Sequence, residues 1–130
     1  MALKVEIKPG ERIIIGESII TNNGHRARLF IEGSEPILRE KDILRPEDAQ
    51  TPCQKIYLAV QMMYLAKDPK QHFDAYFELV KDVQEAAPST MGQIDNINDQ
   101  ILAGSYYKAL KEAKALISYE KELMENAASR

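Results

Sequence analysis

Basic and aromatic residues lie close together in the first third of the chain. Arg26, Arg28 and Phe30 alternate with apolar residues, so a strand would place all three on one face. Guanidinium planes and an exposed ring can stack on unpaired bases, and the charges neutralise phosphates. The alternative, which is more common for such residues, is that Phe30 packs against the protein and the arginines are only solvated.

Residues that could carry catalysis are sparse. His25 and His72 have no second His or Cys at metal-ligand spacing, so we expect surface histidines and no zinc site. Cys53, the single cysteine, lies at a predicted helix start without a partner base, and we expect a neutral, packed thiol. Because there is also no glycine-rich phosphate loop, we expect no catalytic residue, no metal, no cofactor and no enzymatic activity.

Composition limits the class of protein. A chain of 130 residues with 45% hydrophobic content can bury one core without disulfides, and a single cysteine forms no internal disulfide. No apolar run reaches the length of a membrane span, and the N-terminus alternates charged and apolar residues, unlike a signal peptide. These features predict a cytoplasmic protein with no membrane association.

Charge is distributed unevenly along the chain. The net charge of −3 argues against a protein that holds nucleic acid by bulk electrostatics. Eight of the 17 Lys and Arg residues, but only seven of the 20 Asp and Glu residues, lie within residues 1–45. Five of the six arginines also lie there. Since arginine suits phosphates and base edges, any nucleic-acid face is predicted in this first third.

Elements that would position these residues follow from the patterning. Apolar and charged residues alternate in the first strand, and an isoleucine run between glycines forms the second. The Asn22–Gly24 segment is a strong signal for a hairpin turn between the next two strands. The predicted strands cover residues 3–8, 13–15, 26–32 and 37–43, and residues 17–21 either extend the second strand past Gly16 as a bulge or form a third strand.

Helices are predicted for the rest of the chain. Thr51-Pro52-Cys53-Gln54 has the order of a capping box with a first-turn proline, and Asp68-Pro69-Lys70-Gln71 repeats it. The predicted helices run from residue 52 to about 66, from 69 to 87, from 89 to 104 and from about 105 onward. The apolar residues of the first helix, including the Met62-Met63 pair, are expected to pack in the core, as is the stripe of the second helix that includes Phe77.

Together these patterns predict an α+β fold. A small antiparallel β-sheet subdomain over about residues 3–43 would precede a bundle of three to four helices over about residues 51–125. We expect residues 1–45 to carry the candidate RNA-binding face. Residues 46–130 are expected to supply core packing and a surface for protein partners.

Five separated blocks occur in one order over nearly the whole chain: Met1–Glu6, Pro9–Glu17, Pro36–Leu44, Ile56–Leu65 and Tyr107–Ala113. Together these blocks resemble the FlbT family of flagellar biosynthesis regulators of alphaproteobacteria. The resemblance implies a post-transcriptional regulator of flagellin synthesis. Such a protein would bind the 5′ untranslated region of flagellin mRNA and repress translation or promote decay of the message; some relatives act in the positive direction.

A second resemblance covers residues 3–43 only. Gly10–Glu17 and Leu38–Ile43 are similar to the first and last strands of the carbon storage regulator family, small dimeric β proteins that cover ribosome-binding sites. The resemblance matches Arg39 to an RNA-binding arginine of that family's last strand. Its first-strand arginine falls on Ile7, so other cations must compensate.

The residues and resemblances together predict how RNA would be bound. A sheet edge with an adjoining basic face would hold single-stranded leader RNA and compete with the ribosome. The predicted RNA-binding residues are Arg39, Lys8, Lys41, Arg26, Arg28 and Lys4. Flagellin or a flagellar co-regulator is a further candidate partner. The resemblance to a dimeric family and an unpaired strand edge together favour a homodimer.

The competing hypothesis is a protein-interaction adaptor. Amphipathic helices can present a groove to a partner helix, such as a terminal helix of flagellin, and the effect on mRNA would then be indirect.

Overall fold

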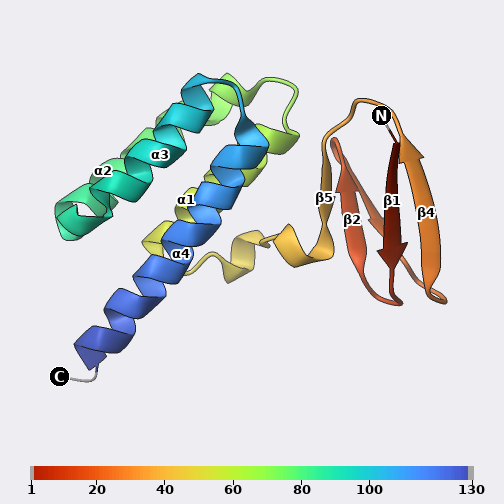
Figure 1. Cartoon of the computed structure of the whole chain (residues 1–130), viewed down its shortest axis with the longest axis horizontal. Helices are drawn as coiled ribbons and strands as arrows, with labels where there is room; N and C mark the ends of the chain where they lie inside the picture. Colours follow the sequence, from red (N-terminus) through yellow and green to blue (C-terminus); the bar gives the residue numbers. More distant parts are fainter. Residues whose placement is uncertain (1, 129–130) are drawn as a thin grey trace. The chain divides into compact units, whose positions relative to one another are not determined.

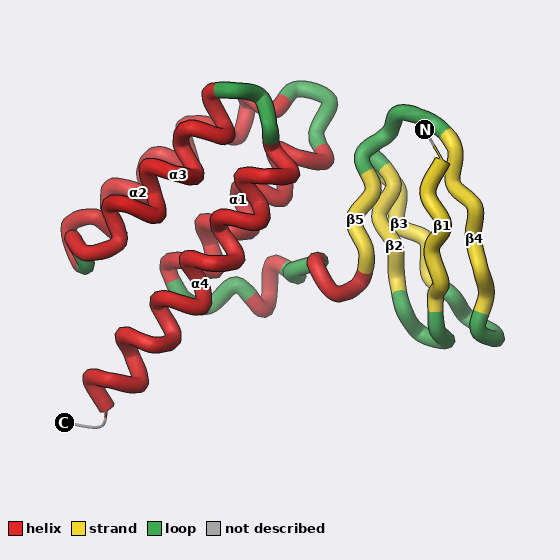
Figure 2. The backbone as a smooth tube through the Cα atoms, in the orientation of Figure 1, coloured by secondary structure: helices red, strands yellow, loops and turns green. Residues whose placement is uncertain are grey.

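The computed structural model describes residues 2–128, which form two compact units (Figure 1). The first unit contains the residues up to Ile43 together with Leu65–Lys67. The second contains Leu44–Tyr64 and the chain from Asp68 onward. The first unit is built of strands and the second of helices (Figure 2).

The predicted α+β fold class is confirmed, because the strands precede the helices along the chain. The strands are β1 (Ala2–Ile7), β2 (Arg12–Ile15), β3 (Ser18–Thr21), β4 (Ala27–Glu32) and β5 (Ile37–Arg39). The α-helices are α1 (Pro52–Leu65), α2 (Phe73–Ala86), α3 (Met91–Leu102) and α4 (Tyr106–Ala128). Short 3₁₀ turns lie at Glu40–Asp42, Pro46–Asp48, Pro69–His72 and Pro88–Thr90. Among residues 2–128, no helix is both long and apolar enough to span a bilayer.

The strands form two antiparallel sheets. β1 pairs with β4, and β2 lies between β3 and β5. The predicted hairpin between the third and fourth strands is therefore wrong, since β3 and β4 belong to different sheets.

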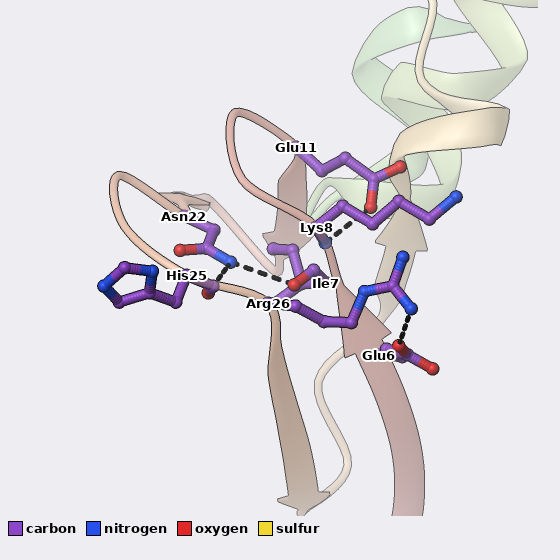
Figure 3. Close-up of polar contacts among 7 residues, drawn as sticks. All are labelled: Glu6, Ile7, Lys8, Glu11, Asn22, His25 and Arg26. Atoms are coloured by element: carbon purple, nitrogen blue, oxygen red, sulfur yellow. Dashed lines mark hydrogen bonds and ion pairs between the residues drawn. The ribbon is translucent and has the colours of Figure 1, made fainter.

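The side chain of Asn22 accounts for this difference (Figure 3). Its Nδ2 donates to the carbonyls of Ile7 at 2.9 Å and His25 at 2.8 Å. Its Oδ1 accepts from the Gly24 N–H at 3.0 Å. Neither Asn22 nor Gly24 has positive φ, which a tight hairpin of the favoured type requires. The segment instead carries the chain from one sheet to the other.

Apolar side chains from both sheets share one core. Val5, Ile7 and Ile13 are its buried centre. Partly buried residues from four strands pack against it: Leu3, Ile15, Ala27, Leu29, Ile31 and Ile37. Because side chains alternate along a strand, the polar residues between these positions lie on the outer faces.

The last strand is shorter than predicted. β5 ends at Arg39, and Glu40–Asp42 forms a 3₁₀ turn in which the Ile43 N–H donates to the Glu40 carbonyl at 3.2 Å. Three consecutive charged residues with low strand propensity favour this early end.

The predicted capping box at the start of α1 is confirmed. The Thr51 N–H donates to Gln54 Oε1 at 3.1 Å, and the Gln54 N–H donates to Thr51 Oγ1 at 3.2 Å. The similar pattern at Asp68 is not a cap: the Asp68 side chain makes no capping bond, and its carbonyl accepts from the Gln71 N–H at 3.4 Å. Pro69 therefore opens a 3₁₀ turn, and α2 begins only at Phe73.

Packing of the helices follows most of the predicted stripes. Fully buried side chains come from all four helices and include Ile56, Val60, Met63, Tyr76, Ile94, Ile97, Leu110 and Leu116. Met62 and Phe77 are exceptions. Both were expected in the core, but Met62 is 43% exposed and Phe77 is 48% exposed, because they lie on the outward sides of α1 and α2.

Candidate nucleic-acid interface

The outer face of the β1–β4 sheet carries the first group of predicted site residues. In the antiparallel register, Lys4 lies opposite Phe30 and Glu6 lies opposite Arg28. Directly opposite side chains project on the same side of a sheet, about 4.5–5.5 Å apart at Cβ. Because the alternate residues of both strands fill the core, these side chains project away from the other sheet.

Phe30 is the most informative residue on this face. Its side chain is 59% exposed, so the interpretation that Phe30 packs is wrong. Lys4 lies directly across from it, and Arg28 lies two residues before it on the same strand. Within residues 2–128, neither Lys4 nor Arg28 forms an ion pair. An exposed ring thus lies between two cations that are available to phosphates.

Phe30 was not among the site residues predicted from the sequence, although its alternation with Arg28 signalled the shared face. Exposed apolar area gains less stabilisation from burial, so most of the Phe30 ring is available for contact with a ligand. We refer to Lys4, Arg28 and Phe30 together as the outer-face cluster.

Arg26 and Lys8 lie at one end of the same sheet (Figure 3). Arg26 Nη1 forms an ion pair with Glu6 Oε1 at 3.0 Å, and both side chains are exposed. Such a surface pair is weak, so a phosphate can replace the carboxylate. The Lys8 N–H donates to Glu11 Oε1 at 2.7 Å, and Figure 3 shows its side chain extending in the same direction as that of Arg26.

Arg39 and Lys41 form a separate group. Arg39 ends β5 and lies opposite Ile13, in the three-stranded sheet, while Lys41 lies in the following 3₁₀ turn. Both side chains are exposed. Arg39 therefore belongs to a different sheet from Lys4 and Arg28, which lie in the β1–β4 pair.

Arg12 and Glu40 lie beside Arg39 and were not singled out by the sequence. Arg12 Nε lies 3.5 Å from Glu40 Oε2, and these two atoms are inaccessible to solvent. The ion pair holds the 3₁₀ turn against the start of β2. We therefore assign Arg12 to the fold and not to ligand binding.

The residues considered for catalysis lie in other surroundings. The Cys53 side chain is buried, and burial, with a smaller contribution from Glu120, raises the pKa of its thiol to about 12. The prediction of a neutral, packed thiol is confirmed. Burial also raises the pKa of Tyr76, whose hydroxyl donates to Asn98 Oδ1 at 2.6 Å. Among the residues that the structure describes, no three potential metal ligands lie together.

Comparison with known proteins confirms the resemblance seen in the sequence. The model of the family described as "Flagellar protein FlbT" matches residues 3–124. A "Probable flagellum biosynthesis repressor protein FlbT 1" from Bradyrhizobium diazoefficiens is 56% identical over 95% of this chain and 85% of its own. A "Probable flagellum biosynthesis repressor protein FlbT" from Rhodopseudomonas palustris is 50% identical over 95% of this chain and 98% of its own.

A more distant relative extends the comparison. The "Flagellum biosynthesis repressor protein FlbT" of Caulobacter vibrioides is 33% identical over 99% of this chain and 94% of its own. No solved structure matches the chain. The family model and these relatives cover nearly the whole length, so the chain belongs to the FlbT family of flagellar proteins.

Proposed function

We propose that this protein regulates flagellum biosynthesis by binding single-stranded RNA in the 5′ leader of flagellin mRNA. The bound protein represses translation or exposes the message to decay, and it acts in the cytoplasm, where the message is translated. The observation that carries the RNA-binding step is the outer-face cluster, with the exposed Phe30 ring between Lys4 and Arg28.

The chemistry of the cluster favours unpaired RNA over a duplex. A base can stack on the Phe30 ring only when it is not already stacked within a helix. Lys4 and Arg28 can then neutralise the flanking phosphates, and Arg26 and Lys8 extend the positive charge toward the end of the sheet. With so few cations and a net charge of −3, affinity depends on stacking as well as charge, and its salt dependence is moderate.

The names of the relatives support the pathway. Several are called repressors of flagellum biosynthesis, and the same direction of regulation is proposed for this chain.

A titration of flagellin leader RNA with single-site variants tests the proposal. Phe30→Leu keeps an apolar side chain but removes the stacking ring, and a base–aromatic stack contributes about 1–3 kcal/mol. We therefore expect the dissociation constant to rise by about fivefold or more. Leu102→Ala, which truncates a highly exposed side chain on α3, is the matched control and should bind normally. Unchanged binding by Phe30→Leu would remove the outer-face cluster from the site.

Comparison of Arg28→Ala with Arg39→Ala identifies which group of cations binds. If the outer-face cluster is the site, Arg28→Ala weakens binding by about 1–3 kcal/mol, and Arg39→Ala has a smaller effect. The reverse order would place the site at the end of β5, as the resemblance to the carbon storage regulator implies. Both side chains are exposed, so neither substitution should change the fold.

Exposed apolar side chains on the helices favour a second candidate function, that of an adaptor for a flagellar protein. Exposed aromatic and methionine side chains there are Met62, Phe77, Met91, Tyr107 and Met124. Apolar and aromatic surface of this kind is enriched in protein interfaces. If the purified protein shifts leader RNA only after flagellin is added, the adaptor function is supported and direct RNA binding is not.

A further inference from the structure

Strand β3 is an unprotected sheet edge. It is hydrogen-bonded to β2 alone, and all four of its residues, Ser18–Thr21, are exposed. Every other strand that the structure describes contains at least one charged residue, whereas β3 contains none. Edge strands usually carry charges or prolines that prevent pairing with another chain.

The backbone register shows which groups of β3 are free to pair. The Asn22 N–H donates to the Glu11 carbonyl at 2.9 Å, so these residues form a hydrogen-bonded pair. Hydrogen-bonded and non-hydrogen-bonded pairs alternate in an antiparallel ladder. Ile20 is therefore bonded to Ile13, and the N–H and C=O groups of Ile19 and Thr21 point away from β2.

The side chains of β3 add an apolar contact surface to this edge. Ile19 is 62% exposed and Ile20 is 44% exposed. Ile20 lies opposite Ile13, so it projects on the face of the sheet that carries the core. Ile13 is buried there, whereas Ile20, one strand further out, is only partly covered.

We propose that β3 pairs antiparallel with β3 of a second copy of this chain, with Ile20 on the two-fold axis. This axis places Ile20 of one copy directly opposite Ile20 of the other, with both side chains on the same face of the sheet, as a directly opposite pair requires. Ile19 of each copy then bonds to Thr21 of the other through the outward-pointing groups, and the two Ile20 side chains meet at the closely spaced position. Pairing of an uncharged strand with its own copy is favourable because it brings no like charges opposite one another.

The resulting assembly is a continuous six-stranded sheet in the order β5-β2-β3-β3-β2-β5. In this assembly the outward-pointing N–H and C=O groups of β3 are hydrogen-bonded, and Ile20 is covered. The contact is short, so the dimer is expected to be concentration-dependent. This proposal does not depend on RNA binding.

Sedimentation velocity of the full chain, from low to high micromolar concentration, tests the pairing. The wild type should shift from monomer toward dimer. Ile19→Pro removes an N–H that points outward, so β2 pairing survives while dimerisation is lost. Ile20→Lys would place two positive charges, one from each copy, opposite each other at the axis, and this variant should also remain monomeric. The control is Leu102→Lys, which makes the same kind of change at a side chain that is 83% exposed and should dimerise normally.

Cross-linking provides a readout that does not require the interface to be disrupted. At a closely spaced pair the two Cα atoms are about 4.5 Å apart, within the range of a disulfide. Oxidised Ile20→Cys should therefore form a covalent dimer, and Leu102→Cys should not. A wild type that stays monomeric at all concentrations would overturn the proposal and leave β3 available for a strand of another protein. A dimer that persists in Ile19→Pro and Ile20→Lys, with no disulfide in Ile20→Cys, would also overturn it, because the copies would then meet elsewhere.

Discussion

Glu120 of α4 caps the N-terminus of α1, and its replacement should destabilise the helical unit. The Thr51 hydroxyl donates to Glu120 Oε1, and the Cys53 N–H donates to Oε2 at 3.1 Å. One carboxylate thus receives two donors and lies at the positive end of the α1 dipole. Because the first N–H groups of a helix have no partner within it, the carboxylate satisfies a group that would otherwise lack one.

The size of the effect follows from these two bonds. A hydrogen bond to a charged group contributes about 1.5–3 kcal/mol, and bonds that share one acceptor are not additive. For Glu120→Ala we expect a loss of about 2–4 kcal/mol in the free energy of unfolding. Glu120→Gln retains one acceptor oxygen but loses the charge, so about half of that loss is expected.

Urea unfolding followed by circular dichroism measures the change. Glu122→Ala is the matched control, because Glu122 lies on the same helix and is exposed. A double-mutant cycle with Thr51→Val separates the Thr51 bond from the Cys53 bond. Equal stability of Glu120→Ala and Glu122→Ala would refute the capping role of Glu120.

Two further predictions concern buried groups. The pKa of Cys53, raised from 9.0 to about 12, means that between these pH values the unfolded chain releases a thiol proton that the folded chain retains. Stability should fall with rising pH there by about 1.4 kcal/mol per unit, and Cys53→Ala should have a correspondingly shallower slope in pH-dependent urea unfolding; parallel slopes would contradict the burial effect. Gln61 is buried and exchanges two hydrogen bonds with the Leu44 backbone, at 2.9 and 3.1 Å. Gln61→Leu leaves both backbone groups unpaired and should cost about 2–4 kcal/mol by the same assay, whereas a loss below about 0.5 kcal/mol would show that water replaces the amide.

Several features of the fold could be predicted because they are local. The alternation of β1 and β4 identified which side chains leave the core, and the Thr51–Gln54 capping box involves residues only three apart. Periods of two and of about 3.6 residues arise from backbone geometry, so contiguous residues are enough to reveal them. The sequence pattern did not decide whether Phe30 is exposed. Alternation shows on which face of the strand a side chain lies, but it does not show whether another element covers that face.

Features that depend on distant residues could not be predicted. The Asn22–Gly24 signal is local and indicated a hairpin between β3 and β4. Burial of the inner faces of both sheets in one core instead favours the pairing of β4 with β1. Asn22 stabilises the crossing between the sheets through a hydrogen bond to Ile7, 15 residues away. Likewise Asp68 has the pattern of a cap but lacks the contact, while Thr51 acquires a second partner, Glu120, from 69 residues further along the chain.

Patterns of residues along the chain were enough to indicate the family, the α+β class and the cations from which an RNA-binding face could be built. Only the tertiary structure separated Arg39 from Arg28, placed Phe30 in solvent between Lys4 and Arg28, and left β3 as an uncharged edge. The physical reason is that periodicity specifies the face of each strand, whereas the choice of strand partners depends on which apolar faces can be buried together.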